Sequence, residues 1–126
     1  MLKTRIAVLW LFMTVASILH YVLVSPEEQQ FLSAAIKQAG TLLSVATAAY
    51  VLIPLVMAFL SVTLNDLANR RVNLVIGIVF TIINIVHILG CPVAYSSAHQ
   101  ILIVLSTIAV SLLIVWYAWK WPKEEP

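Results

Sequence analysis

The chain has 126 residues, of which 63% are hydrophobic and only 10% are charged. Soluble domains are usually about 45–50% apolar and about 25% charged, so this composition argues against a soluble fold and indicates one domain in contact with lipid. The formal net charge of +2, with no run of Lys or Arg longer than two residues, argues against nucleic acid as a partner. Cys91 is the single cysteine, which excludes a disulfide or a thiolate metal cluster within one chain.

The chain contains four apolar stretches, at residues 6–24, 42–64, 72–90 and 100–119. Each is close to the ~20 residues that a helix needs to cross a bilayer, and none contains Asp, Glu, Lys or Arg. A span exposed to lipid must satisfy its own backbone hydrogen bonds, and the short alternating strands of a barrel are not seen in the sequence. The predicted fold class is therefore an all-α integral membrane four-helix bundle, with residues 1–126 as one domain.

The first apolar stretch follows Lys3 and Arg5, an arrangement that also begins a signal peptide. A signal-peptide core is only about 7–15 residues long, so the longer run here predicts a retained helix. Trp10 is interpreted as an anchor at the membrane interface, where tryptophan is enriched.

The segment between the first two stretches carries the signals of a short helix. Ser25 and Glu28 have the spacing of a capping box, Pro26 suits the first turn, and Gly40 suits the end. Apolar residues recur at helical spacing between them, so one interpretation is a short amphipathic helix in the membrane interface. The alternative is that the segment extends the second span, and the sequence leaves both interpretations open.

Two local predictions concern the second and third stretches. Pro54 removes a backbone donor and should kink the second spanning helix, which frees the carbonyl of Tyr50. At the following turn, Asp66 and Arg70 are four residues apart and are expected to form a surface ion pair.

The third stretch carries small and polar residues at intervals of three or four, which places them on one helix face. We call this set the seam, and its members are Asn73, Gly77, Thr81, Asn84, His87 and Cys91. Polar groups in hydrocarbon need partners, so the seam should point into the bundle. It is interpreted as either a packing seam between helices or a ligand-binding face, and packing is the commoner role of such a stripe.

The fourth stretch begins with Ser97 and Gln100, whose spacing predicts a second capping box. Its end carries three tryptophans that are interpreted as interfacial anchors, namely Trp116, Trp119 and Trp121.

The positions of the basic residues predict the orientation of the chain. With both termini in the cytoplasm only Lys37 lies outside, which satisfies the positive-inside rule. The basic residues on the inner side are then Lys3, Arg5, Arg70, Arg71, Lys120 and Lys123. Both termini are therefore predicted to be cytoplasmic.

In this orientation all three histidines, His20, His87 and His99, fall in the outer half of the bundle. His20 and His87 should lie at one depth, because each is about five residues beyond the midpoint of an outward-running helix. Such a layer could bind a metal, ligate haem or relay a proton. No carboxylate within the spans and no paired-ligand spacing supports a metal or haem site, so no cofactor is predicted.

These features favour a non-enzymatic membrane protein that binds a lipid, a small apolar ligand or a partner helix along the seam. The alternatives are a membrane enzyme or electron carrier that uses the histidine layer, and an oligomeric channel or transporter. The spans lack the carboxylate on which small multidrug resistance transporters depend. Membrane lipids are the expected partners, and a homo-oligomer is considered because four helices of this length enclose little volume.

Two short motifs carry a resemblance to a known group of proteins. Residues 68–73 read ANRRVN, and residues 114–122 read IVWYAWKWP. In these motifs the chain resembles a family of uncharacterised small bacterial four-helix membrane proteins, a domain of unknown function that is loosely similar to the DoxX-like proteins. The resemblance implies a four-helix architecture and a bacterial inner membrane, and it carries over no catalytic residue.

Overall fold

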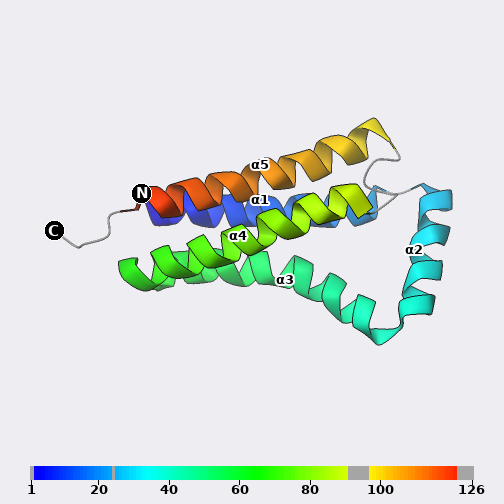
Figure 1. Cartoon of the computed structure of the whole chain (residues 1–126), viewed down its shortest axis with the longest axis horizontal. Helices are drawn as coiled ribbons and strands as arrows, with labels where there is room; N and C mark the ends of the chain where they lie inside the picture. Colours follow the sequence, from blue (N-terminus) through cyan, green and yellow to red (C-terminus); the bar gives the residue numbers. More distant parts are fainter. Residues whose placement is uncertain (1, 24, 91–96, 122–126) are drawn as a thin grey trace.

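A computed structural model describes residues 2–23, 25–90 and 97–121 of the chain. The described part is helical, and its elements are α1 (Leu2–Val22), α2 (Pro26–Ala39), α3 (Thr41–Thr63), α4 (Asp66–Gly90) and α5 (Ala98–Lys120). All of these except α2 are long and apolar enough to cross a membrane (Figure 1). The predicted class, an all-α multi-pass membrane protein with four spanning helices, is therefore confirmed.

The four long helices run along one axis, and α2 lies across one end of them (Figure 1). The start of α1 and the end of α5 lie at the opposite end, which we call the terminal end; the other is the α2 end. Helix α1 packs against both α3 and α5, and α4 packs mainly against α5. Helices α3 and α4 meet over only a short stretch, so the bundle is less tightly closed between these two helices.

Helix α3 bends along its length, and its N-terminal part leans away from α4 toward α2 (Figure 1). The helix contains the buried residue Pro54, which has no backbone N–H to donate to the carbonyl of Tyr50. A proline inside a helix is a common cause of a bend, as the sequence predicted here. The bend separates α3 from α4 toward the α2 end.

Helix α2 is a separate helix, so the interpretation that it extends the second span is wrong; its place in the membrane interface stays a prediction. The backbone N–H of Glu28 donates to Ser25 Oγ at 3.2 Å, and Ser25 N–H donates to Glu28 Oε2 at 2.9 Å, so the predicted capping box is present. Gly40 ends the helix with a φ of 68°, a conformation that glycine adopts without strain. No residue of α2 is buried.

Helix α4 begins at Asp66, before the predicted start of its apolar stretch, because Asn65 Oδ1 accepts the N–H of Ala68 at 2.9 Å and caps the first turn. The predicted ion pair between Asp66 and Arg70 is wrong. Asp66 is paired instead with Lys3 Nζ at 3.0 Å, and this ammonium also donates to the carbonyl of Leu64 at 2.9 Å. The start of α1 is thereby attached to the turn between α3 and α4, a contact that local spacing cannot reveal.

The capping box predicted at the start of α5 is also wrong. Ser97 occupies the N-cap position, but its side chain makes no capping hydrogen bond. The amide of Gln100 turns toward α1, where it donates to the carbonyls of His20 at 3.1 Å and Leu23 at 2.8 Å. Gln100 is buried, and a buried amide needs hydrogen-bond partners, which these carbonyls supply.

The apolar core occupies the half of the bundle near the terminal end. Its buried members are Ile6, Trp10, Met13, Met57, Ala58, Phe80, Val110, Ile114 and Trp121. The interpretation of Trp10 as an interfacial anchor is wrong, because this side chain is fully buried and packs edge-on against Phe80. Trp121 is buried as well, whereas Trp116 and Trp119 are exposed, as anchors must be.

Candidate functional site

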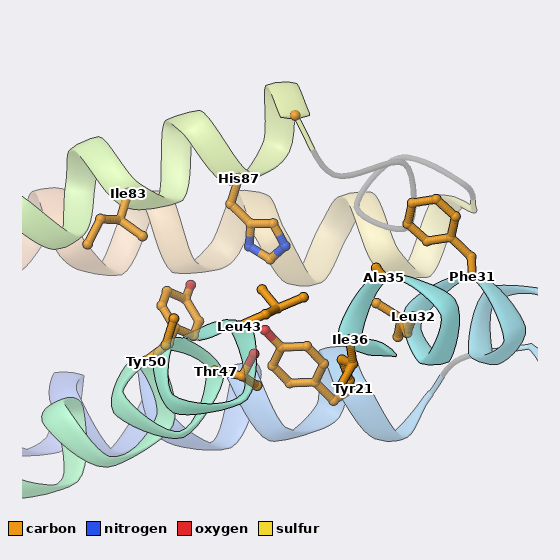
Figure 2. A pocket seen from close by; sticks show the side chains of 12 residues that line it. Tyr21, Phe31, Leu32, Ala35, Ile36, Leu43, Thr47, Tyr50, Ile83 and His87 are labelled. Atoms are coloured by element: carbon orange, nitrogen blue, oxygen red, sulfur yellow. The ribbon is translucent and has the colours of Figure 1, made fainter. Parts of the chain in front are cut away.

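A pocket with a volume of about 450 Å³ lies near the α2 end, between α1, α2, α3 and α4 (Figure 2). Its lining residues are Tyr21, Phe31, Leu32, Ala35, Ile36, Leu43, Ala46, Thr47, Tyr50, Ile83, His87 and Gly90. This volume falls within the range of about 300–1,000 Å³ that is usual for small-molecule sites. None of the lining side chains is an Asp, Glu, Lys or Arg, so the pocket carries no fixed formal charge.

The fold forms this pocket through the bend in α3 and the position of α2. On α3, Leu43, Thr47 and Tyr50 are spaced by four and three residues and therefore share one face, which borders the pocket. On α2, the apolar face formed by Phe31, Leu32, Ala35 and Ile36 covers the α2 end of the pocket (Figure 2). The apolar face of the amphipathic helix α2 thus covers one end of the pocket.

His87 brings a polar ring into this apolar space. The ring extends from α4 into the pocket toward α1 and α3 (Figure 2). It contacts the rings of His20 and Tyr50, with centroid distances of 4.8 Å and 6.0 Å. Within the described part of the chain, neither nitrogen of His87 forms a hydrogen bond. An imidazole N–H or lone pair in an apolar environment has a free-energy cost unless it meets a partner, so His87 is the pocket's clearest polar contact point for a ligand.

His20, by contrast, has its hydrogen-bond partner within the protein. It is buried, and its Nδ1 lies 2.6 Å from Gln100 Oε1. Gln100 also holds the end of α1 through its two bonds to backbone carbonyls. His20 is therefore held in place beside the pocket, where its ring packs against the ring of His87.

His99 lies apart from the other two histidines. It is exposed at the start of α5, and its Nε2 is 3.1 Å from the carbonyl of Leu23 and 3.4 Å from Ser97 Oγ. Among the residues that the structure describes, no three His, Cys, Asp or Glu side chains gather as a metal site would require. The structure thus brings together His20 and His87 but not His99.

The seam residues nearer the terminal end make internal contacts. Asn73 Oδ1 accepts from Trp10 Nε1 at 2.6 Å and from Ser61 Oγ at 3.2 Å, and its amide donates to the carbonyl of Asn69 at 2.9 Å. These bonds join α1, α3 and α4. Gly77 lies where α4 approaches α5 closely, because a Cβ at this position would be 3.0 Å from Val115 Cγ2.

The remaining seam residues lead toward the pocket. Thr81 Oγ1 donates to the carbonyl of Gly77 within its own helix at 2.8 Å. Asn84 Oδ1 accepts from the hydroxyl of Tyr50, and its amide donates to the carbonyl of Thr107 at 3.3 Å. Cys91 lies outside the described residues. Of the five seam residues with a described position, His87 is the one that lines the pocket.

A model of a family of unknown function, DUF6326, matches residues 2–126. The chain belongs to this family. Comparisons with curated proteins and with solved structures gave no match. The match over nearly the whole chain confirms the predicted membership of an uncharacterised family, and because the function of DUF6326 is unknown, any function must be argued from the site.

Two parts of the pocket were not predicted as functional from the sequence. Tyr50 and Thr47 lie on α3, where one signal was available: Pro54 predicts a bend, and a bent helix leaves space beside its displaced turn. The apolar face of α2 was assigned to the membrane interface. Only the position of α2 across the bundle shows that it covers a pocket.

Proposed function

We propose that this protein binds an uncharged, lipid-like molecule in the pocket between α1, α2, α3 and α4. The ligand would have an apolar body and at least one group that forms a hydrogen bond. The apolar residues of α2 and α3 would contact its body, and His87 would bond its polar group. A charged ligand is disfavoured because the lining contains no Asp, Glu, Lys or Arg to neutralise its charge.

Access from the surrounding lipid supports this class of ligand. Ala46 on α3 and Ile83 on α4 line the pocket and are exposed, so the pocket is open between these two helices. Helices α3 and α4 have little contact with each other, so few packing interactions oppose entry between them. A molecule dissolved in the bilayer could enter by this lateral route without first passing through water.

The observation that carries the proposal is the contrast between His87 and the polar residues near it. Asn84 and His20 have hydrogen-bond partners within the protein, whereas His87 has none among the described residues and lines the pocket. His87 is half-buried, and a polar ring that lies against apolar side chains is stabilised by a hydrogen bond to protein, water or a ligand. A bound molecule would supply the missing partner.

The test compares His87→Leu with His99→Leu, because His99 lies outside the pocket. Each variant is purified in mild detergent, and the small molecules that remain bound are counted by native mass spectrometry. One hydrogen bond contributes about 1 kcal/mol, so His87→Leu should weaken retention about fivefold, whereas His99→Leu should match the wild type. Equal retention by the wild type and His87→Leu contradicts the proposal.

We further propose that the protein lies in a bacterial inner membrane with the terminal end on the cytoplasmic side. The support is the distribution of charge: Lys3, Arg5 and Lys120 lie at the terminal end, and Lys37 lies on α2 at the other end. An impermeant amine reagent applied to spheroplasts should label Lys37 and leave Lys120 unlabelled. Labelling of Lys120 alone would contradict this orientation.

A further inference from the structure

A second groove lies between α1 and α5 at the terminal end of the bundle, with a volume of about 560 Å³. Its lining residues are Thr4, Arg5, Val8, Leu9, Leu113 and Tyr117. None of these residues lines the pocket of the proposed function, so the two sites are independent. This groove differs from the first pocket in that a charged side chain, Arg5, lines it.

The groove changes from polar to apolar along the bundle axis. Helices α1 and α5 run in opposite directions, so Arg5 near the start of α1 and Tyr117 near the end of α5 lie at similar depth. Val8 and Leu113 are each three or four residues farther from the terminal end, which places them about 5–6 Å deeper. A lipid has the same order of groups, with a polar head at the surface and an apolar chain below it.

Arg5 supplies the charge that selects the type of head group. Its side chain is exposed, and within the described part of the chain it forms no ion pair or hydrogen bond. Lys3, two residues earlier, is different because Asp66 neutralises it. No acidic residue lines the groove, so the guanidinium is available to a phosphate, which it can bind through two N–H groups at once.

We infer that the groove between α1 and α5 binds an anionic phospholipid from the leaflet at the terminal end. Arg5 would bond the phosphate, the hydroxyls of Thr4 and Tyr117 would add neutral hydrogen bonds, and an acyl chain would lie along Val8, Leu9 and Leu113. A zwitterionic lipid would fit the apolar part equally well, but its own cationic group would compete with Arg5 for the phosphate. The inference therefore makes a prediction about head groups and not only about lipid contact.

The experiment is a titration of the detergent-solubilised protein with phosphatidylglycerol or with phosphatidylcholine of the same acyl chains, followed by native mass spectrometry. The variants are Arg5→Gln, Arg5→Lys and the control Arg71→Gln. Arg71 is exposed at the same end of the bundle but lies on α4, so its substitution removes an equal charge outside the groove. Thermal melting in detergent checks that each variant is folded.

The first phosphatidylglycerol should bind the wild type several-fold more tightly than phosphatidylcholine does. Arg5→Gln should weaken this binding about fivefold, the effect of one basic residue at a membrane surface, whereas Arg71→Gln should leave it unchanged and Arg5→Lys should keep most of it. Three results would overturn the inference: no head-group preference in the wild type, equal losses in Arg5→Gln and Arg71→Gln, or a dimer that covers the groove and excludes lipid. None of these results depends on the pocket that contains His87.

Discussion

The ring of His87 packs edge-on against the ring of His20, with 4.8 Å between the centroids and an angle of 79° between the planes. His20 is held by Gln100, while His87 reaches into the pocket. The two histidines therefore differ in role although they lie at one level of the bundle. His20 forms one of the hydrogen bonds that join α1 to α5, whereas His87 lies where a ligand could contact it.

The first prediction concerns Gln100, which joins the two helices near the pocket. Gln100→Leu should lower the free energy of unfolding by about 1–2 kcal/mol, because it removes the partner of His20 Nδ1 and two bonds to backbone carbonyls. Thermal unfolding in detergent measures the loss. Ser106→Ala is the control and should change stability little, since Ser106 Oγ donates within its own helix, to the carbonyl of Ile103. Equal melting of Gln100→Leu and the wild type would contradict this role.

A second prediction tests the buried bond between Trp10 and Asn73. Trp10→Phe and Asn73→Leu should each destabilise the protein by about 1–2 kcal/mol, because each breaks the contact that joins α1 to α4. Asn73→Leu should lower the free energy of unfolding more than Trp10→Phe does, since Asn73 also forms hydrogen bonds with Ser61 and Asn69. In a double-mutant cycle followed by thermal unfolding, the two losses should not add. Full additivity would show that the bond contributes nothing to stability.

The third prediction concerns the close approach of α4 to α5 at Gly77. Gly77→Leu should destabilise the bundle by about 1–3 kcal/mol, because even a Cβ would crowd Val115 and Ile114. Gly90→Leu is the matched control, since a Cβ at Gly90 meets nothing within 4 Å. Thermal unfolding should therefore separate the two variants. If Gly90→Leu proved the more harmful substitution, the close helix crossing would be contradicted.

The fourth prediction concerns the cap of the helix that covers the pocket. Ser25→Ala removes the side chain that accepts from Glu28 N–H, which should cost about 0.5–2 kcal/mol of local helix stability. Hydrogen–deuterium exchange should accelerate in the first turns of α2 and remain unchanged in α4 and α5. Ser33→Ala, at an exposed position inside α2, is the control and should leave exchange unchanged. Equal exchange in the two variants would show that the cap does not hold α2.

The sequence predicted those features that depend on neighbours along the chain. The four spans follow from the length and apolar character of their stretches, and the start of α2 follows from Ser25 and Glu28, three residues apart. The bend in α3 follows from Pro54 in the same way. In each case the cause and its effect lie within one or two helical turns, so periodicity and spacing are sufficient.

The sequence failed where contacts between helices decide the position of a residue. Trp10 resembles an interfacial anchor until its N–H is seen to bond Asn73, and Gln100 resembles a capping residue until its amide is seen to reach α1. Lys3 and Asp66 are paired although they are far apart in the chain. The pocket needs residues from four helices, and the seam indicated only one of these residues, His87. Helix periodicity gives the face of each helix but not the helix that it meets.

The central claim is that the pocket beside His87 holds a lipid-like molecule, and the most direct test fills this pocket. Ala46→Trp places a large side chain at a position that lines the pocket, whereas Ala48→Trp places the same side chain on an exposed position of α3 that does not line it. The measurement is the amount of small molecule that co-purifies per chain, determined by mass spectrometry of solvent extracts. The wild type and Ala48→Trp should retain the molecule and Ala46→Trp should lose it. Equal amounts in all three folded proteins would contradict the claim.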